Sequence, residues 1–195
     1  MADALLVVDI QNDFCAGGSL AVPDGDAVVP TMNGYMERAT AAGTPIYVSR
    51  DWHPAVTTHF AAFGGTWPPH CVQGTHGAEF HANLRVPATA RLASKGMDPN
   101  DDGYSNIDAI LPDGQRLLES LREAGVTRVF VGGLATDYCV KATALDALKA
   151  GLAVVVLLDA CRAVDAQPGD GERAIAEMVA AGARTAINAD LTAMD

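Results

Sequence analysis

The chain has no excess of basic residues, no long apolar run and no paired cysteines. Its 195 residues include 13 Lys or Arg against 24 Asp or Glu, which gives a net charge of −11. This balance argues against nucleic-acid binding, because proteins of that class present a basic face to the phosphates. No apolar stretch approaches the ~20 residues that span a bilayer. We therefore expect neither a nucleic-acid partner nor a membrane partner.

The four cysteines form neither a CxxC pair nor a dense framework. They are therefore expected to be reduced thiols, as is usual in the cytoplasm. The N-terminus has no basic segment before its short apolar run at 4–8, so no secretory signal is predicted. The sequence leaves open whether the chain acts as a monomer or as a homo-oligomer.

Apolar runs alternate with helical patterns along most of the chain. The expected strands cover 5–8, 45–49, 91–94, 127–132, 153–158 and 184–188. The expected helices cover about 26–42, 114–124, 140–150 and 171–181. This alternation predicts an α/β fold with three α-β-α layers around a mostly parallel sheet. The length suits a single domain over residues 1–195.

Several residues capable of chemistry follow directly on predicted strands. They are Asp9, Asp51, Lys95, Cys139 and Asp159. In open parallel sheets, ligands bind at the carboxyl ends of the strands. Two long segments, 52–90 and 96–113, interrupt the alternation, and long irregular segments in compact domains are usually functional. The sequence therefore predicts a functional site at this edge of the sheet.

Cys139 lies between a predicted strand and a predicted helix. The helix dipole and the free backbone N–H groups there favour a thiolate, which is the nucleophilic form. Asp9 is a candidate base and Lys95 a candidate cation for activating the thiol. Taken singly, a turn aspartate, a solvated lysine and a buried structural cysteine are the commoner interpretations. Their shared position at strand ends favours a catalytic cluster.

Four of the five histidines lie between residues 53 and 76, close to Asp51. Asp51 and His53 alternate in an extended segment, so their side chains project to the same side. With His59 and His70, they form a ligand set that suits Zn²⁺, Fe²⁺ or Mn²⁺. The alternative is a polar loop with surface histidines, and the residues alone favour neither interpretation.

Two further features are candidates for substrate binding. The segment 132–139 combines two glycines with the start of a helix, where backbone N–H groups can stabilise an oxyanion. A turn that requires glycine is the alternative explanation. Phe14, Trp67 and Tyr104 offer rings that can enclose a flat substrate or, alternatively, anchor loops to the core.

Taken together, these motifs resemble the nicotinamidase/pyrazinamidase group of the cysteine hydrolase, or isochorismatase-like, superfamily. The matching motifs are VVDIQNDF at 7–14, GGSL at 17–20, DWHP at 51–54, HF at 59–60, WPPHC at 67–71, KG at 95–96, YS at 104–105 and ATDYCV at 135–140. They appear in family order across nearly the whole chain. The motifs around Asp9 and Cys139 recur throughout the superfamily, whereas the histidine segment with WPPHC points to nicotinamidases.

The resemblance implies a catalytic triad in which Cys139 is the nucleophile, assisted by Asp9 and Lys95. It also implies a cis peptide bond between Leu134 and Ala135, which directs the N–H groups of Ala135 and Cys139 at the oxyanion. It further implies one divalent metal ion, Zn, Fe or Mn, completed by waters and held by Asp51, His53, His59 and His70. The implied pyridine pocket is lined by Phe14, Trp67 and Tyr104.

The implied activity is hydrolysis of nicotinamide, and of pyrazinamide, through a thioester on Cys139, as part of cytoplasmic NAD salvage. One alternative is a hydrolase of the same superfamily that acts on another small amide or on isochorismate. An isochorismatase would not need the four metal ligands, so metal content discriminates between the two. A non-catalytic metal-binding or redox-sensing protein is the other alternative, and it leaves Asp9 and Lys95 without a purpose.

Overall fold

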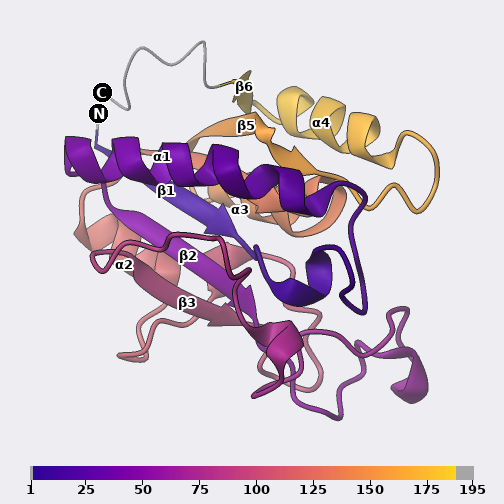
Figure 1. Cartoon of the computed structure of the whole chain (residues 1–195). Coiled ribbons are helices and arrows are strands. Elements are labelled where there is room, and N and C mark those ends of the chain that lie inside the picture. Colours follow the sequence, from indigo (N-terminus) through magenta and orange to yellow (C-terminus); the bar gives the residue numbers. More distant parts are fainter. Residues whose placement is uncertain (1, 188–195) are drawn as a thin grey trace.

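The computed structural model describes residues 2–187. One six-stranded parallel sheet runs through it in the order β3-β2-β1-β4-β5-β6 (Figure 1). The strands are β1 (Asp3–Val8), β2 (Ile46–Asp51), β3 (Arg91–Lys95), β4 (Arg128–Leu134), β5 (Ala153–Arg162) and β6 (Arg184–Ala186). The helices are α1 (Val28–Ala42), α2 (Leu117–Glu123), α3 (Lys141–Lys149) and α4 (Asp170–Ala180). The predicted α/β fold with a mostly parallel sheet is confirmed.

Helices cover the sheet on both faces, and β1 shows how the sequence achieves this. Its side chains alternate between two cores, since successive residues of a strand point to opposite faces. Leu5 and Val7 pack in the core that α1 closes, whereas Leu6 and Val8 pack in the core to which α2, α3 and α4 contribute (Figure 1). Full burial of each such side chain contributes roughly 1.5–3 kcal/mol. None of the described helices has both the length and the apolar character needed to cross a membrane.

Two helices begin later than the sequence patterns indicated. Residues Gly25–Ala27 form a separate 3₁₀ turn, so α1 starts at Val28 rather than at 26. Helix α2 starts at Leu117 rather than at 114, because Ile110 forms a β-bridge with Arg116 and Gly114 between them has φ = 85°. Both helix ends lie close to the positions that the glycine signals predicted.

Strand β5 is longer than expected, and this overturns the placement of Asp159. The strand continues through Asp159 to Arg162 because β5 bulges after Val156, which pairs with Val131, and pairs with β4 again where Cys161 lies opposite Gly133. Asp159 therefore lies inside the strand, where its Oδ1 accepts a hydrogen bond of 2.7 Å from the Tyr35 hydroxyl. The prediction that it lies at the functional edge is wrong. The last strand was predicted to reach residue 188, which lies outside the described residues.

The strand order brings the carboxyl ends of β1 and β4 together in the middle of the sheet. The chain continues from β1 to β2 on one side and later returns to β4 on the other, which makes this a topological switch point. Gly133 is required there, because its φ is +132° and a Cβ would lie 2.0 Å from the Val8 carbonyl oxygen. The close approach places the residues that follow β4 beside Asp9.

Candidate active site

Three charged or nucleophilic side chains meet at the ends of β1, β3 and β4. Lys95 Nζ lies 2.7 Å from Asp9 Oδ2 and 3.3 Å from Cys139 Sγ, and it also donates to Asp51 Oδ1. All four residues are buried. The register accounts for part of this arrangement, because Asp51 and Lys95 are direct partners across β2 and β3. The structure therefore brings together the three residues that the sequence proposed as a triad.

The electrostatic state of Cys139 differs from the one that its position in the sequence suggested. Burial raises the pKa of the Cys139 thiol well above its ordinary value, although the Lys95 charge opposes this and the carboxylates of Asp51 and Asp9 add to it. Burial also raises the pKa of Asp9, against the opposing charge of Lys95. Deep burial and the two carboxylates thus oppose the preference for a thiolate that the helix terminus provides. The thiol must instead give up its proton to a neighbouring group.

The cation of this cluster is strongly held in its charged form. Burial alone lowers the pKa of the Lys95 ammonium, but the Asp51 and Asp9 carboxylates raise it well above its ordinary value. Burial alone would raise the pKa of Asp51, but the opposing effects, of which the Lys95 charge is the largest, together outweigh it and the pKa of Asp51 is lowered. Lys95 is therefore a permanent positive charge between two carboxyl groups and the sulfur.

Ser49 is a member of this cluster that the sequence analysis missed. Its hydroxyl is buried and donates a hydrogen bond of 2.6 Å to Asp9 Oδ1. Ser49 lies two residues before Asp51 on β2, so both side chains leave the strand on the same face. This alternation was the available signal, but a serine inside a predicted strand is too common to stand out.

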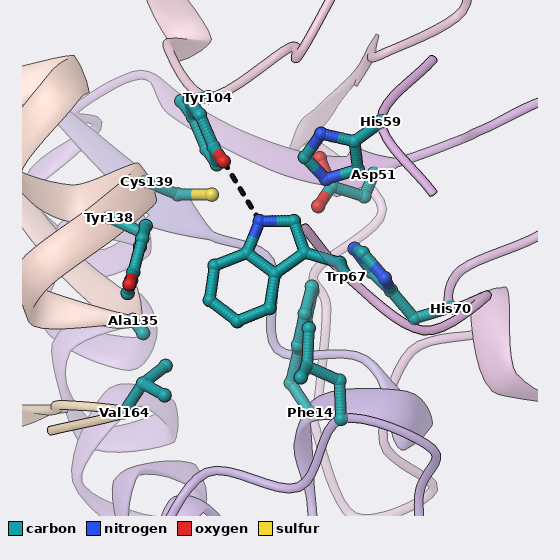
Figure 2. A pocket seen from close by; sticks show the side chains of 11 residues that line it. Phe14, Asp51, His59, Trp67, His70, Tyr104, Ala135, Tyr138, Cys139 and Val164 are labelled. Atoms are coloured by element: carbon teal, nitrogen blue, oxygen red, sulfur yellow. Dashed lines mark hydrogen bonds between the residues drawn. The ribbon is translucent and has the colours of Figure 1, made fainter. Parts of the chain in front are cut away.

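Cys139 itself lies in a single π-helical turn, η6 (Thr136–Val140), that leads from β4 into α3. The Leu134–Ala135 peptide bond before this turn is cis, as the family resemblance implied. Ala135 and Cys139 both line the same pocket (Figure 2). Backbone N–H groups at such a helix start are suited to binding a developing oxyanion.

A cluster of three buried imidazoles lies on the other side of Asp51. One nitrogen each from His53, His59 and His70 lies within 4.8 Å of the other two. Asp51 Oδ2 lies 3.7 Å from His53 Nε2, so Asp51 turns one oxygen to Lys95 and the other to the histidines. The structure thus gathers the four residues that were proposed as metal ligands.

The outer nitrogens of the three rings all meet oxygen atoms. These Nδ1 contacts are His53 to the Gly96 carbonyl at 3.1 Å, His59 to Asp102 Oδ1 at 2.9 Å and His70 to the Pro68 carbonyl at 2.8 Å. An oxygen acceptor requires hydrogen on Nδ1, which leaves a lone pair on Nε2 for an ion. His53 Nε2 is buried without a hydrogen-bond partner, a costly arrangement that a metal ion would relieve. The donor set therefore fits a divalent metal ion.

The Cys139 sulfur and two of the imidazoles, those of His59 and His70, open into one pocket (Figure 2). It is lined by Phe14, Leu20, Asp51, His59, Trp67, His70, Tyr104, Ala135, Tyr138, Cys139 and Val164. Figure 2 shows the Trp67 indole in the middle of these side chains, with Nε1 donating to the Tyr104 hydroxyl at 2.9 Å. The cavity that remains is about 30 Å³, which holds one or two water molecules. Phe14, Trp67 and Tyr104, which were predicted to bind the substrate, thus all line this pocket.

The sequence analysis also missed part of the pocket wall. Tyr138, Leu20 and Val164 line it, and the Tyr138 ring lies 4.8 Å from that of Trp67 in an edge-on arrangement. Val164 is held in place because its backbone N–H donates to Asp137 Oδ1 at 2.9 Å. Tyr138 precedes the nucleophile directly, which was a usable signal, whereas nothing in the local sequence marks Leu20 or Val164.

A parallel sheet whose switch point unites a cysteine, an aspartate and a lysine defines an isochorismatase-like cysteine hydrolase. In agreement with this, the isochorismatase domain matches residues 3–190, and the chain belongs to this family. A nicotinamidase of Escherichia coli (strain K12) is 44% identical over 199 residues, covering 92% of both chains.

Solved structures agree with this assignment. A pyrazinamidase of Pyrococcus horikoshii in complex with zinc is 43% identical and superposes with a TM-score of 0.87, covering 96% of this chain and 99% of its own. A protein of L. infantum solved in complex with nicotinate is 37% identical with a TM-score of 0.88, covering 98% and 96%. The resemblance to nicotinamidases and pyrazinamidases that the motifs indicated is confirmed.

Proposed function

We propose that this chain is a nicotinamidase, which hydrolyses nicotinamide to nicotinate and ammonia. The observation that carries the proposal is the contact of Lys95 with Cys139 and Asp9, beside a pocket that His59 and His70 of the imidazole cluster also line. The extensive similarity to nicotinamidases supports the same substrate. A substrate of this kind is a flat, uncharged ring with one carboxamide, which suits a small pocket walled by aromatic side chains.

The first half of the reaction forms a thioester. Asp9 takes the proton of the Cys139 thiol, and the sulfur attacks the carboxamide carbon. The negative charge that develops on the carbonyl oxygen is stabilised by the backbone N–H groups of Ala135 and Cys139. Collapse of this intermediate breaks the C–N bond, and Asp9 returns its proton so that ammonia leaves.

The second half regenerates the cysteine. A water molecule gives a proton to Asp9 and attacks the thioester carbon, and the carboxylic acid leaves as the C–S bond breaks. The proton returns to the Cys139 sulfur. Throughout both halves, the Lys95 ammonium offsets the negative charge that moves between Asp9 and Cys139. This role follows from its contacts with both groups.

Asp51, His53, His59 and His70 would hold one divalent metal ion beside this cluster. Bound there, the ion supplies a Lewis acid that either binds the pyridine nitrogen or activates a water. Zn²⁺, Fe²⁺ and Mn²⁺ all accept imidazole and carboxylate ligands, and the related pyrazinamidase in complex with zinc favours Zn²⁺. The same ring position is a nitrogen in pyrazinamide, so we propose pyrazinamide as a second substrate. NAD salvage is the context that this reaction serves.

Substrate entry requires movement of the pocket wall. The cavity of about 30 Å³ is too small for a pyridine carboxamide, and the Trp67 indole occupies its middle (Figure 2). Trp67 is half-buried, and interface side chains commonly change rotamer on binding. We therefore expect the Trp67 side chain to swing aside, which breaks its hydrogen bond to Tyr104, and then to close against the bound ring.

The test is ammonia release from nicotinamide by the purified protein, with bound metal counted in the same sample. We expect turnover with about one ion per chain. Absence of ammonia from a folded, metal-loaded protein would reject nicotinamide as the substrate and direct the search to other small amides. Pyrazinamide in a parallel assay shows whether the ring nitrogen is sufficient for recognition.

A further inference from the structure

We propose that Asp102 is a positioning residue for His59 and that it tunes the affinity of the site for its metal ion. This inference rests on the metal site of the proposed function. The residue belongs to the segment 96–104, called the strap here, which carries no family motif between Gly96 and Tyr104. Asp102 touches neither the substrate pocket nor the sulfur, so its effect reaches the reaction through His59.

The three imidazoles are held in two different ways. The Nδ1 atoms of His53 and His70 meet backbone carbonyls, whose positions are given by the path of the chain. His59 Nδ1 meets a side-chain carboxylate, Asp102 Oδ1, at 2.9 Å. The His59 side chain is 3% exposed, whereas the Asp102 side chain is 64% exposed. One of the three proposed imidazole ligands is thus oriented by an acidic group at the protein surface.

The Asp102 carboxylate affects how strongly the His59 imidazole can bind a metal ion, in addition to orienting the ring. It makes a charge-assisted hydrogen bond, which is about twice as strong as a bond to a neutral acceptor. It also increases the electron density on Nε2, so a metal ion binds that nitrogen more tightly. Loss of such an outer partner typically lowers metal affinity about 10–100-fold. Asp102 should therefore contribute to affinity more than an exposed ion pair contributes to stability.

The strap is a closed loop that presents Asp102 in a defined place. A Cβ on Gly103 would lie 2.3 Å from the Gly96 Cα, so the two ends of the strap touch. Both glycines have φ = +65°, which a residue with a side chain adopts only with strain. The Gly103 N–H donates to Asp101 Oδ1 at 3.0 Å, which orders the chain next to Asp102.

The strap is also hydrogen-bonded to the segment that carries His59. The Pro99 carbonyl accepts hydrogen bonds from the Thr58 backbone N–H at 2.8 Å and from the Thr57 hydroxyl at 3.1 Å. These threonines directly precede His59. At the first residue of the strap, the Gly96 carbonyl orients His53. The strap therefore contacts the Nδ1 atoms of two imidazoles, those of His53 and His59. Among the described residues of the strap, Asp102 is the only one that makes such a contact with an ionisable group.

The experiment measures metal affinity directly in protein stripped with a chelator and then titrated with Zn²⁺ against a competing chelator. The variants are Asp102→Ala and Asp102→Asn, and the matched control is Asp101→Asn. The control makes the same charge change one residue away and keeps the oxygen that accepts from Gly103. We expect a 10–100-fold weaker affinity for Asp102→Ala, a smaller loss for Asp102→Asn, and a change of less than about twofold for Asp101→Asn.

A second measurement separates positioning from general stability. Protein loaded with Co²⁺ has visible absorption bands that report the ligands of the ion. Asp102→Ala should shift these bands, whereas Asp101→Asn should leave them unchanged. Thermal unfolding of the stripped variants checks that each is folded, and Asp102→Asn retains the shape of an exposed side chain if the alanine variant fails to fold.

Equal affinities for the Asp102 variants and the wild type, with unchanged Co²⁺ bands, would overturn the proposal. An equal loss of Zn²⁺ affinity in Asp101→Asn and Asp102→Asn would also overturn the proposal, since the change in net charge alone would then explain the weaker binding. Metal titration needs no turnover, so a protein that binds Zn²⁺ without hydrolysing nicotinamide would refute the proposed activity and leave the role of Asp102 standing. A wild-type protein that takes up no ion would overturn the role of Asp102.

Discussion

The two halves of the pocket are built from different kinds of structure. The catalytic half, Asp9, Lys95 and Cys139, lies at the ends of parallel strands or in the turn directly after one. The metal half, His53, His59 and His70, lies in the segment between β2 and β3, where the described chain has only isolated bridges and two short 3₁₀ turns. Asp51 ends β2 and belongs to both halves through its two oxygens.

Because of this difference, we expect the catalytic half to be rigid and the metal half to be more adaptable. Register and backbone ladders hold the catalytic half, so its geometry forms with the sheet itself. The metal half depends on a few hydrogen bonds between loops, such as those from Gly96, Asp102 and Pro68 to the imidazoles. Three imidazoles whose Nε2 atoms face one another do not attract one another, so a bound ion should order this half more than the other. Substitutions in one half should therefore leave the other half largely intact.

The largest expected effect is that of Cys139→Ala. Removal of the nucleophile should lower kcat by about 10⁴-fold or more, as is found when catalytic nucleophiles are deleted. Metal stoichiometry should stay near one ion per chain, because the sulfur contacts Lys95 rather than the imidazoles. Ammonia release and metal content in the same sample check both statements. Retained turnover would remove Cys139 from its assigned role.

His53→Ala is the reciprocal change. We expect a loss of metal affinity greater than the ~10–100-fold that accompanies removal of an outer hydrogen-bond partner. Some stability should also be lost, because the fully buried His53 side chain packs against Phe60, so the stripped variant is compared with the stripped wild type. Metal titration and thermal unfolding measure the two effects. Unchanged metal binding would show that the ion, if any, lies elsewhere.

Two glycine substitutions should separate the halves by stability rather than by activity. In Gly133→Ala, the added Cβ meets the Val8 carbonyl at 2.0 Å, and the free energy of unfolding should fall by about 1–3 kcal/mol or more. In Gly96→Ala, the Cβ meets the His53 ring at 2.5 Å, so metal affinity should fall more than stability does. Denaturant unfolding of stripped protein and metal titration measure both.

Gly34→Ala is the control for this pair. Gly34 lies inside α1 with no atom within 4 Å of an added Cβ, so alanine should stabilise the fold by roughly 0.5–1 kcal/mol. If the Gly96 and Gly133 variants lost the same free energy of unfolding and the same metal affinity, the distinction between the two halves would be refuted.

Ser49→Ala should lower turnover much less than Cys139→Ala does. It removes the hydroxyl that donates to Asp9 Oδ1, a bond to a charged group worth about 1.5–3 kcal/mol, so kcat should fall by up to about 10–100-fold. Metal affinity should not change. Ser94→Ala is the matched control, since that hydroxyl accepts from Arg50 and does not touch Asp9. Similar kcat values for the two variants would exclude Ser49 from the catalytic half.

The catalytic half was easier to predict because each of its residues borders a recognisable strand. Asp9 and Lys95 follow apolar runs, and Cys139 follows two glycines and precedes a helical pattern. The same reasoning failed for Asp159, because β5 bulges after Val156 and then resumes its pairing with β4 at Cys161. Local reasoning also gave no measure of the burial of Cys139, which raises the pKa of its thiol and depends on what the other segments bring to the sulfur.

Contacts between distant loops were beyond local reasoning. His59 and Asp102 are 43 residues apart, and no periodicity or turn signal relates them. Ser49 and Asp9 are 40 residues apart and meet only because β1 and β2 pair in one register. Likewise, Leu20 and Val164 come to the pocket wall through the docking of irregular segments.

The amino-acid sequence determined the alternation of strands and helices, the chemistry available at their ends and the family to which the chain belongs. Apolar periodicity, glycine positions and short motifs are local properties, and they act before any long-range contact forms. Tertiary structure alone decided which atoms touch: the ammonium of Lys95 between Asp9 and Asp51, the inward Nε2 atoms and the carboxylate behind His59. These are contacts between side chains far apart in sequence, and their distances and protonation depend on burial that only the packed fold creates.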